Sequence, residues 1–498
     1  MLIRTLFKSR YWWLLHDKEE IDKVNFMWTQ LKKASIMSSL KCKLVNSKDK
    51  QAVKDPNSNL ATPNSKLKKR KVSSANSRSP EPGSDSNDKA VKLNPEPVGS
   101  FNEDQKSPQA KAEKEEKKEP TVAQIRNQPT KIESYPWKLY NKIEDNYHLS
   151  NKKALLLNMR GYYESIREDV FDSLPVTFHV KEGVSDPNFA EFKDYYDNRQ
   201  DNNQLNMWII KPGENTNRGQ GIQVAKEYSE IKRIIEDSTK TRKRICIVQK
   251  YIHNPLLYNR RKFDIRTYAM GTSINGNFKG YYYQEGYIRT SCKEFNLHNV
   301  HNRMIHLTND AVQKKCEDYG KFEPGNKLSY AEFQNYLDKN YSNLNVCFER
   351  DILPQFKKLT TDCFRATMGK MDPSKRVNTF EVYGLDFMLD ENFKVYLIEV
   401  NTNPCLELAS PLLARLIPSM LENSLRLAVD PLFPPPENFS QRKHVVNELC
   451  PENKYDLVFD ERIDGPELCE LYREKENVIV ELNEEELSDS EEFDDEDE

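Results

Sequence analysis

Two apolar runs joined by a short polar turn, residues 383–389 and 393–401, constrain the fold of this chain more than any other segment. Runs of this length, separated by Asp-Glu-Asn at 390–392, are typical of two antiparallel strands in a hairpin. Because both runs are apolar along nearly their whole length, we expect both faces of the hairpin to be buried. The chain must therefore build a sheet that other elements cover.

Two carboxylates interrupt these apolar runs. Counting from the turn places Asp386 and Glu399 nearly opposite each other, with Asn401 on the same face as Glu399. Two buried carboxylates repel unless a cation lies between them, and Mg²⁺ prefers a few carboxylate or amide oxygens together with substrate phosphates. The spacing predicts a Mg²⁺–nucleotide site at Asp386, Glu399 and Asn401. The alternative is that they are edge-strand acids that face water.

Further β-rich runs, at residues 207–210, 245–248 and 263–268, alternate with helical patterns. Strands mixed with helices, several of them in hairpins, predict an α+β or α/β enzyme fold. We expect this folded body to extend from about residue 135 to about residue 482, and residues 1–45 to be structured as well.

The composition changes between residues 46 and 128. Lys, Ser, Asn, Pro and Glu dominate there, and Phe101 is the only aromatic residue. Such a segment cannot bury enough apolar surface to offset chain entropy, so we predict that it is disordered. Within it, Lys66–Val72 resembles a nuclear import signal, or is a solvated basic cluster.

Charge is distributed unevenly along the chain. The last fifteen residues contain eleven acids and no base, so that a chain with a net charge of −3 has a body of about +8 without them. A basic body favours an acidic partner, and the alternative is a solvated acidic tail on an ordinary basic protein.

Several classes of protein are disfavoured by the sequence. The nine cysteines include no C-x-x-C pair, which indicates reduced thiols and neither a disulfide framework nor a zinc site. We expect Cys405 to be a small buried thiol and not a nucleophile. No stretch approaches the roughly 20 apolar residues of a membrane span, so no membrane partner is expected. Zinc-finger spacing is absent too, so no nucleic acid partner is expected.

A polar, glycine-bearing loop follows a short strand that ends in Lys211. The loop includes Gly213, Arg218, Gly219 and Gly221, and glycines let backbone amides approach phosphate oxygens while Lys or Arg supplies charge. The segment is neither a P-loop nor a Rossmann fingerprint, because the required spacing is missing.

The strand at 261–268 has a charged face. In an extended chain Lys262, Asp264 and Arg266 share one face while Phe263 and Ile265 share the other. Beside a phosphate site these charges are predicted ligands, and otherwise they form a solvated sheet surface. The segment 249–252 could supply backbone groups to an adenine edge, and Arg289 and Thr308-Asn309 add further polar groups.

In this order, these clusters resemble the tubulin tyrosine ligase-like family, whose fold is ATP-grasp. The motifs that carry the resemblance are Lys262-Phe263-Asp264-Ile265-Arg266, His306-Leu307-Thr308-Asn309, Gly384-Leu385-Asp386-Phe387 and Leu397-Ile398-Glu399-Val400-Asn401. Residues Arg10–Trp13 and Phe26–Gln30, and the region from about Leu139 to Phe433, match as well.

The resemblance implies an α+β ATP-grasp fold with a small N-terminal domain, a central domain and a C-terminal catalytic domain. Residues 1–45 and 131–206 would form the N-terminal domain, interrupted by a disordered insertion at 46–130. Residues 207–436 would hold the central and catalytic regions, followed by a C-terminal extension at 437–482 and an acidic disordered tail at 483–498.

The resemblance also implies an ATP-dependent ligase that joins a free amino acid to a glutamate-rich protein tail. ATP would phosphorylate a carboxylate of the tail, and the amine of the amino acid would attack the acyl phosphate, with ADP and phosphate as products. The expected partners are tubulin or microtubules and a free amino acid, and the protein is expected to be a monomer. It would act in the cytoplasm and cytoskeleton, with a cilium, a flagellum or, through Lys66–Val72, the nucleus as further locations.

Site residues are carried over from the family motifs to matching positions of this chain. Mg²⁺ would bind Asp386, Glu399 and Asn401. The nucleotide would bind Lys211, Arg218, Gly219, Gln220, Gly221, Lys262, Phe263, Asp264, Thr308 and Asn309, with Gln249, Lys250, Tyr251 and Ile252 at the adenine. The expected catalytic residues are Arg266 near the transferred phosphate, Arg289 on the carboxylate of the amino acid, and Glu399.

Glycine is the favoured amino acid. The segment Asp310–Lys315 that follows Asn309 resembles glycylating members or the tyrosine ligase more than glutamylating members, which usually carry Tyr-Ser or Tyr-Ala there. Tubulin polyglutamylation and tyrosine ligation remain alternatives. From other classes, the alternatives are a non-catalytic microtubule-binding protein and a modifier of nuclear proteins.

Overall fold

The computed structural model describes residues 2–8, 10, 13–16, 24–40, 138–202, 204–212, 221–240, 246–375, 378–434 and 452–475. The chain divides into two units, and all of the described residues belong to the unit made of residues 1–43 and 132–498. The predicted disordered insertion, the Lys66–Val72 cluster and the acidic tail lie outside the described residues. The predicted domain boundaries remain predictions.

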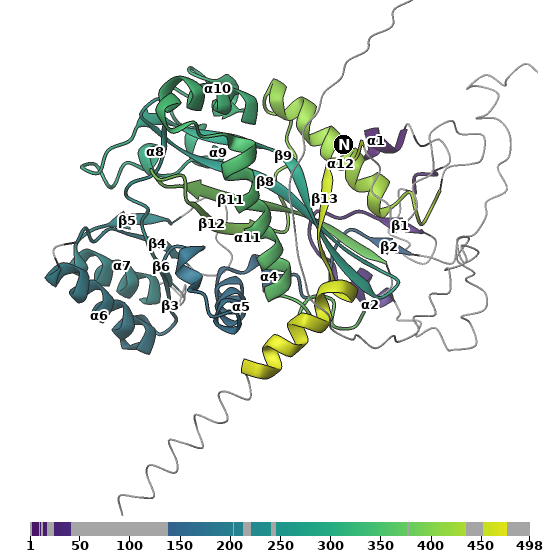
Figure 1. Ribbon diagram of the computed structural model, residues 1–498, viewed down its shortest axis with the longest axis horizontal. Helices are drawn as coiled ribbons and strands as arrows, with labels where there is room; N and C mark the ends of the chain where they lie inside the picture. The colour runs from purple at the N-terminus through teal and green to yellow at the C-terminus, as the bar shows by residue number, and fades with distance from the viewer. Residues whose placement is uncertain are drawn as a thin grey trace, which may run out of the picture. The chain divides into compact units, whose positions relative to one another are not determined.

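The described residues build two sheets (Figure 1). The nine-stranded sheet has the order β1-β2-β11-β8-β9-β10, with β12 paired to β11, β13 to β9 and β7 to β8. Its strands are β1 (Phe26–Met27), β2 (Leu139–Tyr140), β7 (Leu257–Tyr258), β8 (Arg261–Ile274), β9 (Asn277–Glu294), β10 (Lys327–Leu328), β11 (Thr379–Leu389), β12 (Val395–Asn401) and β13 (Tyr455–Asp460). The four-stranded sheet has the order β3-β6-β4-β5, made of β3 (Thr177–Val180), β4 (Trp208–Pro212), β5 (Gln223–Ala225) and β6 (Cys246–Lys250). Nearly all of the pairs are antiparallel, which confirms the α+β class.

The helices are α1 (Leu2–Lys8), α2 (Ala34–Ser39), α4 (Tyr147–Ser150), α5 (Lys152–Ser165), α6 (Pro187–Asp201), α7 (Tyr228–Lys240), α8 (Arg303–His306), α9 (Asp310–Gln313), α10 (Tyr330–Asn340), α11 (Leu353–Ala366) and α12 (Pro411–Ala428). Single turns lie at Val170–Asp172, Gly183–Ser185, Pro324–Asn326, Ser342–Leu344 and Phe348–Ile352, and residues 461–475 are helical. None of the helices in the described ranges is long and apolar enough to cross a membrane.

The longest hairpin joins β8 and β9 through Asn275 and Gly276. Both residues have positive φ angles, 53° and 72°, which the turn of a two-residue hairpin requires and which Asn and Gly adopt most easily. This turn sets the register of the strands that carry most of the charged residues of the site.

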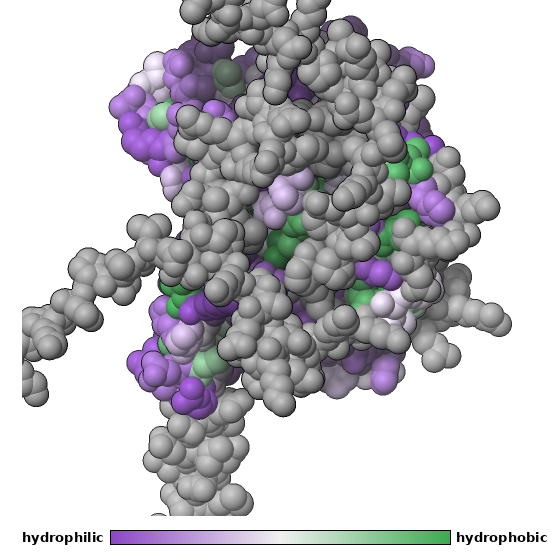
Figure 2. Space-filling model, turned by 90° about the vertical axis from the view of Figure 1, so that its right-hand side faces the viewer, coloured by the Kyte–Doolittle hydropathy of each residue, from purple (hydrophilic) through white to green (hydrophobic). Residues whose placement is uncertain are grey.

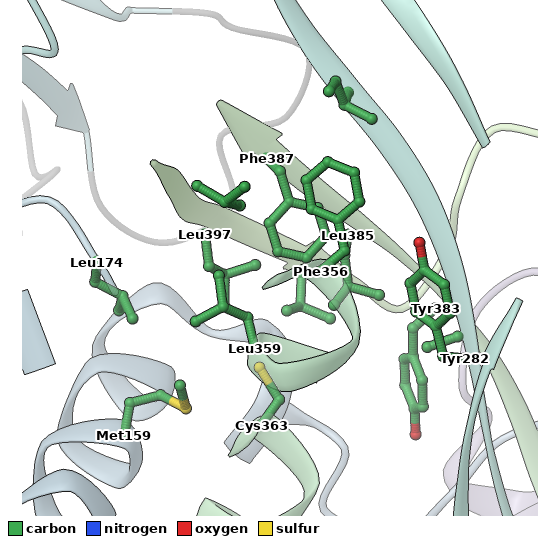
Figure 3. Close-up of a cluster of buried hydrophobic side chains, with 14 of the residues drawn as sticks. Met159, Leu174, Tyr282, Phe356, Leu359, Cys363, Tyr383, Leu385, Phe387 and Leu397 are labelled. Atoms are coloured by element: carbon green, nitrogen blue, oxygen red, sulfur yellow. The ribbon is translucent and has the colours of Figure 1, made fainter. Parts of the chain in front are cut away.

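The nine-stranded sheet is covered on both faces, and the alternation along β8 shows how. Phe263 and Ile265 point into a core formed with α5, α10 and α11, whereas Tyr268 and Met270 pack in a second core with α12. Figure 3 shows side chains of α11, Phe356, Leu359 and Cys363, next to Leu385 and Phe387 of β11. Lys262, Asp264 and Arg266 share the face of β8 on which Tyr268 and Met270 lie.

Burial of the 383–401 hairpin differs between its two strands. Every residue of β11 is buried, as expected, but β12 alternates between buried and half-buried residues. The expectation that both strands are buried on both faces is wrong for β12, because among the described strands β12 pairs only with β11. One edge of the sheet therefore opens at β12.

On the face shown in Figure 2 most described side chains are hydrophilic, with isolated hydrophobic ones between them.

Candidate active site

Asp386 and Glu399 lie directly opposite each other on β11 and β12, and Gly384 lies opposite Asn401. This register confirms the pairing predicted from the turn. The amide nitrogen Nδ2 of Asn401 donates a hydrogen bond to Glu399 Oε1 at 3.3 Å. The three residues therefore share one face of the hairpin.

A ladder of buried ion pairs continues across β8 and β9. Arg266 lies opposite Asp386, and Arg289 lies opposite Asp264. Arg266 donates through Nε and Nη2 to the two carboxylate oxygens of Asp386 at 2.5 and 3.1 Å, and Arg289 donates in the same way to Asp264 at 2.6 and 2.7 Å. Arg289 Nη2 also lies 2.9 Å from Asp386 Oδ2, which joins the two pairs into one network.

The ladder is not a solvated sheet surface. Lys262, Asp264, Arg266, Arg289 and Asp386 are all at most 9% exposed. Burial opposes the charged form of Arg289, yet the carboxylates of Asp264 and Asp386 raise its pKa well above the usual value. Charges held this far from water need their partners, so the ladder acts as one unit.

Lys262 lies at one end of the ladder. Its Nζ donates to Tyr251 OH at 3.0 Å and to the carbonyl oxygen of His306 at 3.1 Å, and it lies 4.3 Å from the centre of the Tyr251 ring. Burial lowers the pKa of Lys262 to about 7. Nearby, Thr308 Oγ1 donates to Asp264 Oδ2 at 2.6 Å. The segments 249–252 and Thr308-Asn309, both predicted to bind the nucleotide, therefore contact residues of the ladder.

The four-stranded sheet contributes Lys211. Its Nζ donates to Gln249 Oε1 at 2.7 Å, and Gln249 Nε2 donates to Thr177 Oγ1 at 2.9 Å. Burial, together with the charge of Lys152, lowers the pKa of Lys211 to about 8, while Glu399 and Asp386 act in the opposite direction. Lys211 of the four-stranded sheet and Arg266 of the nine-stranded sheet therefore both interact with the carboxylates of the opposed pair, Asp386 and Glu399.

Lys152 is a site residue that the sequence reasoning missed. Its Nζ lies 2.9 Å from Glu399 Oε2, and the charge of Glu399 raises the pKa of Lys152. Burial alone would raise the pKa of Glu399, but the ammonium groups of Lys152 and Lys211 hold it well below its usual range. A signal was present in the sequence, because a Lys at the first position of a helix opposes the helix dipole.

The remaining residues predicted to bind the nucleotide lie in several different places. The ring of Phe263 packs 5.1 Å from that of Phe333 in the core, so its side chain points away from the face that holds Lys262, Asp264 and Arg266. Lys250 and Ile252 flank Tyr251 and are partly exposed, and Asn309 precedes α9. Arg218, Gly219 and Gln220 lie outside the described residues, and Gly221 has a φ of 71° in a turn.

The expectation for Cys405 is wrong, and Gln313 has a structural role. Cys405 is exposed, because the loop after β12 runs over the surface. Gln313, part of the segment that favoured glycine, is fully buried, and its amide accepts from Cys292 N–H at 2.7 Å and donates to the carbonyl oxygens of Met304 and Leu307 at 3.1 and 2.5 Å. Gln313 holds backbone in place and does not reach the site.

The donor set fits a Mg²⁺ ion that is shared with phosphate. No group of three His, Cys, Asp or Glu side chains arranged to hold a metal occurs in the described part of the chain. Glu399 retains 28% exposure of its side chain, however, and Asn401 is half-buried beside it, with Asp386 behind them. Mg²⁺ usually takes only one or two carboxylates and completes its shell with water and phosphate oxygens, which this set allows.

Comparison with known proteins places this geometry in a family. The model of the tubulin-tyrosine ligase family matches residues 130–437. The chain is 37% identical over 229 residues to tubulin glycylase 3A of Drosophila melanogaster, covering 45% of this chain and 22% of that protein. It is 34% identical over 230 residues to the human protein monoglycylase TTLL8, covering 45% of this chain and 26% of the relative.

A relative with a different printed activity also matches. The chain is 31% identical over 281 residues to the human probable tubulin polyglutamylase TTLL2, covering 55% of this chain and 43% of that protein. The aligned region thus spans between about a fifth and just over two fifths of the length of these curated relatives. Because the family model covers more than half of the chain, the protein belongs to the tubulin-tyrosine ligase family.

Proposed function

We propose that this protein is an ATP-dependent ligase that adds glycine to glutamate side chains or tails of tubulin through an acyl-phosphate intermediate. The observation that carries the proposal is the convergence of Lys152, Arg266 and Arg289 on the opposed carboxylates Asp386 and Glu399. Phosphoryl transfer depends on positioned positive charge more than on covalent chemistry from the protein.

Each residue would have a role set by its position in the site. Lys211 and Lys262, buried on the two sheets, would bind phosphate oxygens, and Gln249–Ile252 would lie along the adenine. Arg266 would neutralise charge at the transferred phosphate, while Thr308 and Asp264 hold the nucleotide side of the ladder. Mg²⁺, when bound at Asp386, Glu399 and Asn401, would neutralise the negative charge that develops on the phosphates.

Arg289 would receive the carboxylate of the incoming amino acid. Its Nε and Nη2 groups are occupied by Asp264 and Asp386, so the remaining Nη1 edge is the one that could donate to a ligand. The Nη1 group alone could donate to one oxygen of that carboxylate. Burial beside the ladder would hold this group in a fixed orientation.

The names of the relatives support glycine as the amino acid. Two of those compared are glycylases, and a glycylated tubulin tail is consistent with the basic body of this chain. Polyglutamylation is the second candidate, because the probable polyglutamylase TTLL2 matches over a larger share of this chain. Activity on tubulin would place the protein at microtubules, in the cytoskeleton or a cilium.

The test is transfer of labelled amino acid. The full chain is incubated with microtubules, Mg-ATP and, separately, labelled glycine, glutamate or tyrosine, and label on tubulin is counted. We expect glycine to be incorporated and Glu399→Gln to lower the rate by about 10³-fold, as loss of a main electrostatic group does. Glu391→Gln, at the turn of the same hairpin and hydrogen-bonded to Asn254, is the matched control and should keep its activity.

The outcomes separate the candidates. Glutamate label in place of glycine would favour polyglutamylation, and tyrosine label would favour tyrosine ligation. Absence of any transfer, with microtubule binding intact, would contradict the ligase proposal and favour a non-catalytic microtubule-binding protein.

A further inference from the structure

A second ion pair lies directly beside Arg289. Lys327 of β10 is the register partner of Arg289 on β9. Its Nζ lies 2.8 Å from both carboxylate oxygens of Asp310 and donates to the carbonyl oxygen of Gly325 at 2.8 Å. Asp310 opens α9 and follows Thr308-Asn309, so this pair and the ladder meet at the same segment.

The two members of the pair differ in burial. The Lys327 side chain is 1% exposed, whereas that of Asp310 is 31% exposed. Burial and the charge of Arg289 lower the pKa of Lys327, which shows that the two cations lie within electrostatic range of each other. Asp310 therefore presents its carboxylate to solvent beside the buried ammonium of Lys327.

Tyr319 forms a wall of this pair. Its OH donates to Asp310 Oδ1 at 3.4 Å, and Lys327 Nζ lies 5.9 Å from the centre of its ring. Because Lys327 is buried and Asp310 is partly exposed, the carboxylate of Asp310 is the member of this pair that a molecule from solvent can reach.

We propose that Asp310 selects the amino acid by rejecting acidic side chains, so that the site takes a small uncharged amino acid such as glycine. This inference rests on the proposed function, in which Arg289 receives the α-carboxylate. Lys327 is the register partner of Arg289 on β10 and, in this proposal, the cation with which a glutamate side chain would pair.

Asp310 acts in two ways. With both oxygens it occupies the ammonium of Lys327, so a second carboxylate finds that cation already neutralised. Its own charge also repels an acidic side chain, and a like charge placed against a competitor is a standard source of specificity. Glycine has no side chain to place near Asp310, so the affinity for glycine is not reduced.

Direct binding tests this inference. Equilibrium dialysis of labelled glycine and labelled glutamate is carried out on the full chain with Mg²⁺ and a non-hydrolysable ATP analogue. We expect wild-type protein to prefer glycine, and Asp310→Asn to bind glutamate about tenfold more tightly while its affinity for glycine changes by less than about twofold. The variant keeps an oxygen that can accept from Lys327.

Three further variants sharpen the test. Asp318→Asn is the matched control, since Asp318 is a neighbouring acid paired with Lys293 at 2.6 Å, and it should bind both amino acids like wild type. Adding Lys327→Gln to Asp310→Asn should remove the gained glutamate affinity. Asp310→Ser replaces Asp310→Asn if the latter does not fold.

Each result decides the inference. An unchanged ratio in the Asp310 variants, equal binding of both amino acids to wild type, or binding of neither would overturn it. Glycine transfer to microtubules with an unchanged ratio would leave the proposed function standing while the inference fails. The expected shift in binding without any transfer would support the inference and remove the proposed activity on tubulin.

Discussion

The ammonium group of Lys152, at the start of α5, lies 2.9 Å from the carboxylate of Glu399 on the edge strand β12. The pair joins segments that are far apart in the chain, and it places a protein cation on a predicted Mg²⁺ ligand. Ammonium and metal would therefore compete for the same carboxylate.

Removal of Lys152 tests this competition. In the absence of nucleotide, Lys152→Met should bind Mn²⁺, used as a spectroscopic substitute for Mg²⁺, about 3- to 10-fold more tightly, or ~1 kcal/mol. Titration followed by electron paramagnetic resonance measures this. Glu399→Gln should instead weaken Mn²⁺ binding. Equal affinities of Lys152→Met and wild type would show that Glu399 is not a ligand or that Lys152 does not compete.

The ladder should be stabilising only as a complete unit. Arg289→Met leaves Asp264 and Asp386 buried with too little positive charge, and we expect a loss of about 3–5 kcal/mol of unfolding free energy. Urea denaturation measures the loss. Arg415→Met, which removes an exposed arginine paired with Glu285, should cost less than about 1 kcal/mol. Similar losses of unfolding free energy in Arg289→Met and Arg415→Met would contradict the view that the ladder is stable only as a complete unit.

Nucleotide affinity should depend on pH through Lys262. Because its pKa is lowered to about 7, the ammonium form that attracts phosphate is lost as the pH rises through that value. Between pH 6 and pH 8 the protonated fraction of Lys262 falls by about tenfold, so we expect the affinity for Mg-ATP to fall by about tenfold as well. Isothermal titration checks this. Between pH 6 and pH 7, where Lys211 with its pKa of about 8 is still mostly charged, Lys262→Arg should show a much flatter profile, and a steep profile there would refute the assignment.

Gly286 permits the close approach of β9 to Arg266. A Cβ atom there would lie 2.4 Å from the carbonyl oxygen of Arg266 and 2.2 Å from Tyr330 OH. Gly286→Ala should therefore cost about 1–3 kcal/mol of stability and lower activity by displacing Arg266. Gly161→Ala, on α5 with open space around its Cβ, should be neutral or stabilising by up to about 1 kcal/mol. Thermal unfolding and the transfer assay report both effects.

A buried pair behind the site holds the loop after Asn401. Lys142 Nζ donates to Glu381 Oε1 at 2.8 Å and to the carbonyl oxygen of Thr402 at 2.7 Å, and Glu381 is completely buried. Lys142→Met should cost about 3–5 kcal/mol, because Glu381 is left without its cation.

The same variant should speed amide hydrogen exchange at residues 400–404. Lys193→Met, from an exposed pair with Asp197, should cost less than about 1 kcal/mol and leave exchange there unchanged. Unaltered exchange in Lys142→Met would show that the pair does not hold the loop.

Local patterns in the sequence predicted much of the site. The two-residue period of an extended chain is enough to place Lys262, Asp264 and Arg266 on one face and to set Asp386 opposite Glu399. The same period places the side chain of Phe263 on the opposite face, in the core.

Properties that depend on the surroundings of an element were harder to predict. The burial of β12 depends on whether another strand covers its edge, and the exposure of Cys405 depends on the path of a loop. The role of Gln313 depends on which backbone groups surround its amide. None of these is encoded in the spacing of neighbouring residues.

The sequence by itself determined the hairpin of β11 and β12, its register, and the shared face of Lys262, Asp264 and Arg266, because these follow from backbone geometry over a few residues. Only the tertiary structure decided that Lys152 reaches Glu399 and that Lys327 and Asp310 lie beside Arg289. Contacts between distant segments are fixed by how helices and sheets pack, and that packing depends on the whole apolar core. The face on which each charged residue lies therefore follows from the nearby sequence, whereas its ion-pair partner depends on how distant segments pack together.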